Sequence, residues 1–65
     1  MSAAAEVRAE ELRADDVLAG GEVIRWAGPS ARPGAIRVEW VESAHGRPVV
    51  AWTIHQASDI LEVIR

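Results

Sequence analysis

The chain has 65 residues and a mass of 7.0 kDa, 49% of its residues are hydrophobic, and it contains no cysteine. This length allows one small domain and excludes a second core, and the lack of cysteine excludes disulfide bonds and thiolate zinc sites as supports for that domain. The formal net charge of −3 opposes a general attraction to phosphate polymers and anionic membranes.

The N-terminal part of the chain is predicted to form a short strand near Glu6 to Ala9, followed by a bent acidic loop. Its richness in Ala, Glu, Arg and Leu supports an alternative, a helix over residues 3–14, because these residues have high helix propensity. However, Val7, Leu12 and Val17 are spaced by five residues, and that spacing follows no face of a helix. We therefore prefer the strand.

Three further strands are predicted in the middle of the chain, where β-branched residues and Trp are frequent. They span residues 22–27, 35–42 and 49–55. Residues 28–34 contain two Pro and two Gly, which end the first of these strands. Residues 43–47, closed by Pro48, suit a hairpin loop in which Gly46 has a positive φ. The three strands are therefore expected to form an antiparallel meander.

The large apolar residues of this meander all have even numbers, so the alternation of side chains along a strand is expected to place them on one face. A register shifted by one residue would move half of them to the other face. The predicted cross-strand pairs are Trp40 with Val50, Val38 with Trp52, Ile36 with Ile54, Trp26 with Ile36, and Ile24 with Val38.

The C-terminal part is predicted to be one more strand. Residues 60–64 form an apolar run that is too short for an independent helix. Residues 56–59, which precede it, are expected to form a single short helical turn. The predicted order is thus a short strand, a long loop, the meander, one turn and a terminal strand.

This layout resembles the Src-homology-3-like small β-barrel, in which one turn commonly separates the fourth and fifth strands. The segment from Leu12 to Leu18, followed by Gly20 and Gly21, also resembles the entry segment of small barrels, with Asp15 where Gly is usual. The resemblance implies an all-β fold, a five-stranded barrel formed by residues 6–65, with residues 1–5 as a flexible N-terminus. Fold resemblance carries no function with it.

Catalytic and metal-binding patterns are absent from the sequence. His45 and His55 are isolated and lack the spacing of a metal pair, and Asp15 and Asp16 are adjacent, as in residues that fix turns. Gly20 and Gly21 lack the spacing and the Lys of a phosphate-binding loop. We therefore expect no enzymatic activity, no cofactor or metal, and no small-molecule substrate.

The three tryptophans have two interpretations. Trp26, Trp40 and Trp52 share one parity, and each buries about 150–250 Å2 when it is enclosed, so the first interpretation assigns all three to the core. The second places Trp26 at the rim of the barrel, beside the Pro-rich loop, as a platform for a base or a partner side chain.

The outer face of the predicted meander carries Arg and Val. In the predicted register Arg25 lies opposite Arg37, and this like-charge pair is compensated by the diagonal Glu39, or else it binds phosphate or carboxylate groups together with Arg32. Arg is enriched at protein interfaces and exposed Val gains nothing in water. The predicted partner-binding residues are Val23, Arg25, Arg37, Val41, Val49 and Ala51.

These observations predict a small non-enzymatic interaction module that binds a protein partner, or a second copy as a homodimer, through its outer sheet face. The alternative is a nucleic-acid-binding barrel. Its predicted contacts are Arg25, Trp26, Arg32, Arg37 and Arg47. The acidic segment from Glu6 to Asp16 suggests a third, weaker alternative, a mimic of nucleic acid. Because no apolar run approaches the roughly 20 residues of a membrane span, and no signal peptide is recognisable, a cytoplasmic location without a membrane partner is expected.

Overall fold

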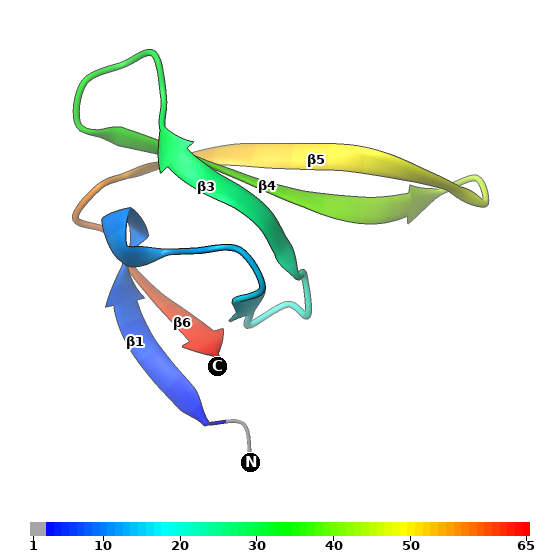
Figure 1. The fold of residues 1–65 in the computed structure, drawn as a ribbon, viewed down its shortest axis with the longest axis horizontal. Helices are drawn as coiled ribbons and strands as arrows, with labels where there is room; N and C mark the ends of the chain where they lie inside the picture. The colour runs from blue at the N-terminus through cyan, green and yellow to red at the C-terminus, as the bar shows by residue number, and fades with distance from the viewer. Residues whose placement is uncertain (1–2) are drawn as a thin grey trace.

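The computed structural model describes residues 3–65 as an all-β protein with two antiparallel sheets (Figure 1). Its elements are β1 (Ala4–Arg8), a short 3-10 helix η1 (Ala9–Glu11), β2 (Val17–Leu18), β3 (Ile24–Pro29), β4 (Ala35–Ala44), β5 (Arg47–Gln56) and β6 (Ile60–Ile64). The first sheet has the strand order β1-β6-β2 and the second has the order β3-β4-β5. The all-β class, the central meander and the terminal strand are therefore confirmed.

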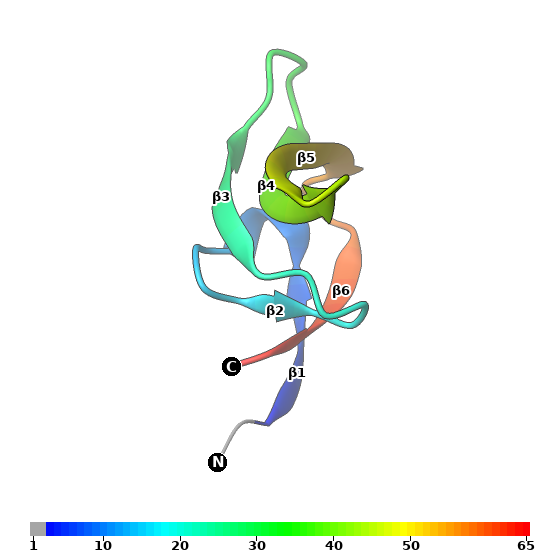
Figure 2. The same ribbon diagram turned by 90° about the vertical axis from the view of Figure 1, so that its right-hand side faces the viewer.

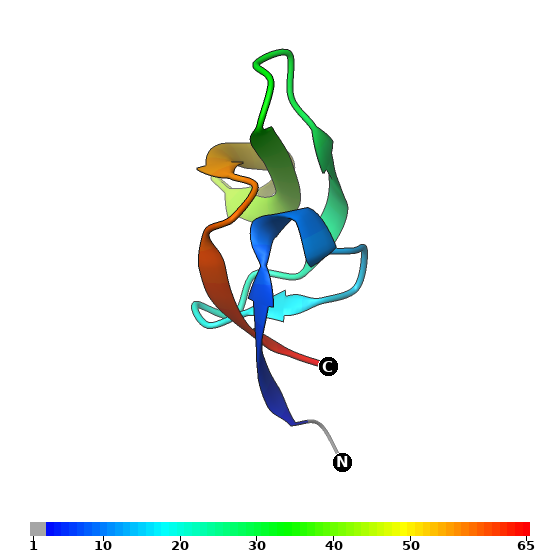
Figure 3. The ribbon, with the colours of Figure 1, turned by 90° about the vertical axis from the view of Figure 1, so that its left-hand side faces the viewer.

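The two sheets are not closed into a barrel within residues 3–65, and they contain six strands where five were expected. The first sheet lies at one end of the second, and the distal part of the β4–β5 hairpin extends beyond the first sheet (Figure 1). Figure 3 looks along the hairpin from its base, with the first sheet below it. The segment before β6 is a hydrogen-bonded turn, in which the N–H of Asp59 donates to the carbonyl oxygen of Gln56 at 3.0 Å. The single turn predicted at this place is therefore confirmed as one isolated turn, and the short helix of residues 3–65 is η1.

The N-terminal part forms a strand, and the alternative helix over residues 3–14 is wrong. β1 begins at Ala4, two residues before the predicted start of the domain, and pairs with β6 from Ala4 opposite Ile64 to Arg8 opposite Ile60. Pairing with a terminal strand satisfies its backbone groups and overrides the local helix propensity. Residues 1–2 of the predicted flexible segment lie outside the described residues. In residues 3–65, no helix has the length and hydropathy that crossing a bilayer would require.

The predicted register between β4 and β5 is wrong by one residue. Trp40 lies opposite Ala51, and Val50 lies opposite Val41. The hairpin turn consists of only two residues, His45 and Gly46, with φ values of 52° and 74°. Two central residues with positive φ form the tight connection whose twist matches a two-stranded ribbon. The prediction used a longer loop, and the shorter turn moves the even residues of β5 to the opposite face from the even residues of β4.

The predicted register between β3 and β4 is also wrong. β3 continues through Gly28 and Pro29, which were expected in the loop, so Pro29 and not Trp26 lies opposite Ile36, and a β-bulge interrupts the strand between Ile24 and Trp26. Ile24 lies opposite Trp40, whereas Trp26 lies opposite Glu39. A bulge places two residues of one strand against one residue of its neighbour, so it reverses the alternation that follows it. Trp26 consequently lies on the opposite face of the sheet from Ile24.

The core lies between the two sheets and is small. Its buried apolar residues come from β1, η1, β3, β4 and β6, together with Leu12, and they are Val7, Ala9, Leu12, Ile24, Val38 and Val63. Of the three tryptophans, only Trp40 packs against this cluster, and it is half-buried. Figure 2 looks along the hairpin from its tip and shows the strands of the first sheet below it. The surface of the second sheet opposite the core has no layer over it within residues 3–65.

Candidate interaction surface

The surface of the second sheet that points away from the core is apolar and aromatic. We call it the tryptophan face. The cross-strand register assigns to it Trp26 from β3, Arg37, Glu39 and Val41 from β4, and Val50, Trp52 and Ile54 from β5. Trp26 and Trp52 lie on either side of Glu39 in one row across the sheet, and their side chains are 44% and 54% exposed. Because neighbouring strands are about 4.8 Å apart, the two tryptophan backbones are separated by about 10 Å.

Arg37 is held in place by two neighbours on this face. Its Nε donates a hydrogen bond to Oε2 of Glu39 at 3.0 Å, and its guanidinium carbon lies 4.2 Å from the centre of the Trp52 ring. Each contact contributes only about 0.5–1 kcal/mol at an exposed position. Together they fix the direction of a long side chain before any partner arrives, which lowers the entropy that binding must overcome.

Trp26 lies over the neighbouring Gly28, and this close approach depends on the glycine. A Cβ atom added at Gly28 would come within 2.6 Å of Cζ2 of Trp26. Gly28 itself lies opposite Arg37 in β4. The absence of a side chain at position 28 therefore lets the Trp26 ring lie along the sheet toward the row that contains Arg37.

A shallow cleft of about 500 Å3 borders the tryptophan face where β3 ends. Its lining comes from Pro29 and the loop after it, from β4 and from β5, and consists of Pro29, Ser30, Ala31, Arg32, Arg37, Trp52 and Ile54. The loop is fixed at both ends, because the Arg32 N–H donates to Oγ of Ser30 at 3.1 Å and the Ala57 N–H donates to the Gly34 carbonyl at 2.8 Å. Both charged side chains that line this cleft are arginines.

A second cleft, of about 700 Å3, lies beside it, between the loop after β3 and the turn before β6, and His55 is part of its lining. Nδ1 of His55 lies 3.7 Å from Oδ2 of Asp59, a carboxylate that also accepts a hydrogen bond from the backbone of Gln56 at 3.0 Å. Asp59 therefore has a role in the turn. No group of three or more His, Asp or Glu side chains in residues 3–65 is arranged to hold a metal ion.

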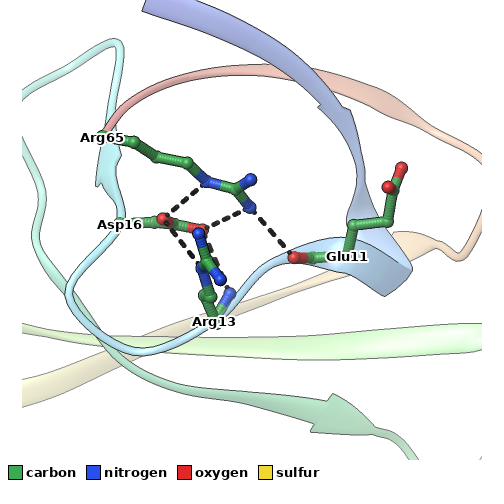
Figure 4. Close-up of polar contacts among 4 residues, drawn as sticks. All are labelled: Glu11, Arg13, Asp16 and Arg65. Carbon is green, nitrogen blue, oxygen red and sulfur yellow. Dashed lines mark hydrogen bonds and ion pairs between the residues drawn. The ribbon is translucent and has the colours of Figure 1, made fainter. Parts of the chain in front are cut away.

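The one buried charged residue of the described chain is Asp16, which is 3% exposed. Its carboxylate accepts hydrogen bonds from Nε of Arg65 at 3.0 Å, from a second guanidinium nitrogen of Arg65 at 3.2 Å, and from the Arg13 backbone at 3.1 Å (Figure 4). The same Arg65 nitrogen donates to the backbone carbonyl of Glu11 at 3.1 Å. These hydrogen bonds join the C-terminal end of the described chain to the loop after η1, so the role of Asp16 is structural.

The protonation of Asp16 reflects this pairing. Burial by itself raises the pKa of the Asp16 carboxyl, because it penalises the charged form. The hydrogen bonds from Arg65 and from the Arg13 backbone, with the positive charges of both arginines, outweigh burial and hold the pKa of Asp16 below its usual value. The same contact raises the pKa of Arg65. Asp16 is therefore an ionised structural residue.

The structure separates the six residues that were predicted to share an outer face. Arg37 and Val41 lie on the tryptophan face, whereas Val49 and Ala51 lie opposite Glu42 and Trp40, on the core-facing side of the hairpin. Val23 precedes β3 and forms an isolated bridge with Val17, on the edge of the first sheet. The prediction of one shared face is wrong because it depended on the incorrect register.

The predicted pair of arginines is also separated, because Gly28 and not Arg25 lies opposite Arg37. Arg25 occupies the bulge in β3. Of the five residues of the predicted nucleic-acid set, Arg32 and Arg37 meet in the first cleft, and Trp26 lies on the same face as Arg37. Arg47 begins β5 beside the distal hairpin turn, at the far end of the strand from the Ile54 that lines this cleft.

The assignment of all three tryptophans to the core is wrong for Trp26 and Trp52. Val50 and Ile54, which were also expected in the core, are exposed. One local signal, the dipeptide His45-Gly46, predicts a two-residue turn, because His is among the residues enriched at positive φ and Gly has no penalty there. That turn would have given the observed register of β5, whereas the bulge in β3 has no comparable signal.

Comparisons with known proteins found no match among family models, curated proteins or solved structures, so the proposals below depend on the geometry of the chain itself.

Proposed function

We propose that the protein is a small non-enzymatic interaction module that binds a protein partner through the tryptophan face. The observation that carries this proposal is the exposure of Trp26 and Trp52 on one side of the same sheet. Trp and Arg are the residues most enriched among the side chains that dominate binding energy at protein interfaces. On this face the two tryptophans lie on either side of Glu39, and Arg37, which is already oriented, lies against the Trp52 ring with aliphatic side chains nearby.

The charge of the face favours a polypeptide over a nucleic acid. Glu39 lies between the two tryptophans, at the centre of the face, and it pairs with Arg37. A phosphate chain laid across the tryptophans would have to approach this carboxylate, and it would meet a chain with a net charge of −3. A protein partner meets no such general repulsion.

The test is a comparison of three immobilised proteins, the wild type and the variants Trp26→Ser and Ile60→Ser. Ile60 is an exposed apolar residue of the first sheet, so its replacement is the matched control. We expect the wild type and Ile60→Ser to retain the same polypeptide, and Trp26→Ser to lose it. Titration of that purified polypeptide should then show binding weakened by about thirtyfold or more in Trp26→Ser. Equal retention by all three proteins would contradict the proposal.

A second candidate function, binding of single-stranded nucleic acid, is supported by one observation. Arg32 and Arg37 line a cleft together with the exposed Trp52, a combination suited to phosphates and to a stacked base. Titration of labelled DNA and RNA oligonucleotides at low and moderate salt separates the two functions. Binding that falls steeply with salt and is lost in Arg32→Glu with Arg37→Glu would favour nucleic acid, and a flat titration at low salt would exclude it.

Two finer sequence predictions are also kept as proposals. The resemblance to Src-homology-3-like barrels is supported by the central meander, the single turn before the last strand and the terminal strand, although the two sheets of residues 3–65 remain open. A cytoplasmic location is supported by the composition and by the absence of cysteine.

A further inference from the structure

The outer edge of β5 is open. β5 has ten residues and is the last strand in the order β3-β4-β5, and no strand of residues 3–65 pairs with its far side. Figure 1 shows β5 above β4 over the middle of the hairpin, with no strand drawn along its upper side there. Edge strands of native proteins are normally protected by charged side chains, Pro or a bulge. β5 has Arg47 and Pro48 at its start and no charged residue from Val49 to Ile54, and its register with β4 is unbroken.

The hydrogen bonds at the end of β5 show which of its residues pair with β4 through their backbone groups. At the end of β5, the N–H of Gln56 donates to Asp59 at 3.0 Å, and its carbonyl accepts from Asp59 at 3.0 Å. Its neighbour in β4, Ala35, bonds instead with Ser30 and Arg32. Ala35 and Gln56 therefore form a pair without mutual hydrogen bonds.

Pairs with and without hydrogen bonds alternate along an antiparallel ladder. Counting back from Gln56 in the continuous register, Ile54, Trp52 and Val50 direct their N–H and C=O groups away from β4. Pro48 falls in the same series, and a proline without an N–H suits a position that faces outward. The free groups are thus centred on Trp52.

The exposed area of the chain is larger than a monomer of this size requires. A folded protein of 7.0 kDa is expected to expose about 4,000 Å2, whereas this chain exposes 4646 Å2. The excess of roughly 600 Å2 approaches the surface of about 800 Å2 that each partner contributes to a stable interface. The radius of gyration of 11.9 Å also exceeds the value of about 11 Å expected for a compact chain of this length. The extended hairpin accounts for this shape (Figure 1).

We infer that β5 pairs antiparallel with β5 of a second copy, so that two three-stranded sheets become one continuous sheet around a two-fold axis. A two-fold axis through Trp52 places Trp52 opposite the same residue of the second copy and Val50 opposite Ile54 of that copy. This register uses all three free residues on both chains, because they are centred on Trp52. A symmetric pairing of this kind closes after two copies and builds no fibre.

The second copy fits this edge better than an unrelated strand does, because the edge is self-complementary. The facing side chains are an aromatic pair flanked by two aliphatic pairs, and such cross-strand pairs stabilise a sheet. Arg47 lies outside the paired segment in this register, so no like charges face each other across the axis. This pairing does not depend on which partner the tryptophan face binds. In the dimer, the tryptophan faces of the two copies would lie side by side on one continuous sheet.

Sedimentation equilibrium over micromolar to millimolar concentrations tests the inference on the wild type and on two variants. We expect the wild type to reach twice the 7.0 kDa mass of the chain. Trp52→Lys should raise the dissociation constant by about thirtyfold or more, because it removes the central aromatic pair and places like charges opposite each other. Val41→Lys is the matched control, since Val41 is 51% exposed on the same face but belongs to the central strand β4. Its dissociation constant should change by less than about threefold.

Amide hydrogen exchange of the wild type provides a second measurement that requires no variant. Protection of the Val50, Trp52 and Ile54 amides should increase with protein concentration, while the amide of His55 should not respond. Circular dichroism shows whether Trp52→Lys remains folded. If this variant unfolds, the hydrogen exchange of the wild type is the deciding measurement. A monomeric wild type at millimolar concentration, equal weakening by both variants, an unchanged Trp52→Lys dimer, or exchange independent of concentration would each overturn the inference. Partner binding that depends on Trp26 would survive any of these results.

Discussion

The two faces of the second sheet are made by the same three strands and differ in what lies over them. On the inner face, Ile24 and Val38 are fully enclosed between the sheets. On the outer face, Trp26 and Trp52, which have far larger apolar surfaces, remain exposed. The hydrophobic stabilisation of a side chain depends on the area removed from water and not on its size. The smaller residues therefore stabilise the fold, and the larger ones are left available for binding.

The largest contrast is expected between two isoleucines of this sheet. Ile24→Ala should lower the free energy of unfolding by about 2–5 kcal/mol, because it leaves a cavity at a residue that is 1% exposed. Ile54→Ala, at a residue that is 43% exposed, should lower it by less than about 1 kcal/mol. Urea denaturation measured at a low protein concentration compares the two. Equal losses would show that the outer face is covered in solution.

The next effect concerns the buried carboxylate of Asp16, which joins the C-terminal end of the described chain to the loop after η1. Asp16→Asn should lower the free energy of unfolding by about 1–3 kcal/mol, because the amide cannot reproduce all the hydrogen bonds and charge interactions with Arg65 and Arg13. Asp15→Asn is the control, since Asp15 is exposed and has a φ of 76° that Asn tolerates. A loss as large for Asp15→Asn as for Asp16→Asn would assign the effect to the loop and not to the buried pair.

The same residue predicts a dependence on pH. The folded-state pKa of Asp16 is lowered, so its stabilising contribution is present above the unfolded-state value of about 3.9 and is lost as the pH falls through the lower folded-state value. The difference in stability between the wild type and Asp16→Asn should therefore be constant near neutral pH and decrease below about pH 4. Urea denaturation at a series of pH values measures it. A difference that grows on acidification would contradict the direction given for this pKa.

The smallest effect is expected on the outer face. A double-mutant cycle with Arg37→Met and Trp52→Leu should give a coupling free energy of about 0.5–1 kcal/mol, because the cation lies 4.2 Å from the ring centre at a largely exposed position. Neither single variant should reach the loss of Ile24→Ala. The cycle is measured by urea denaturation at a low protein concentration. A coupling above about 2 kcal/mol would mean that the tryptophan face contributes to the fold as strongly as the core does.

Much of the strand pattern followed from local features. The β-branched runs of the meander and the short apolar run of β6 each predicted a strand that is observed, whereas the Pro- and Gly-rich segment 28–34 was expected to be a loop and its first two residues belong to β3. The candidate surface did not follow, because its composition depends on register. A two-residue turn at His45 and Gly46 and one bulge after Ile24 place Trp26 and Trp52 on the outer face, where smaller residues were expected.

The sequence by itself determined the all-β class and the central meander, because strand propensity and turn residues act over a few neighbouring positions. Only the tertiary structure decided which tryptophans are buried, that Asp16 pairs with Arg65, and that the two sheets stay open. Each of these outcomes depends on contacts between distant segments, and Asp16 and Arg65 are 49 residues apart in the sequence. A shift of one residue in a strand reverses the face of every side chain in it, so a pattern of alternating residues identifies a strand without identifying which face is covered.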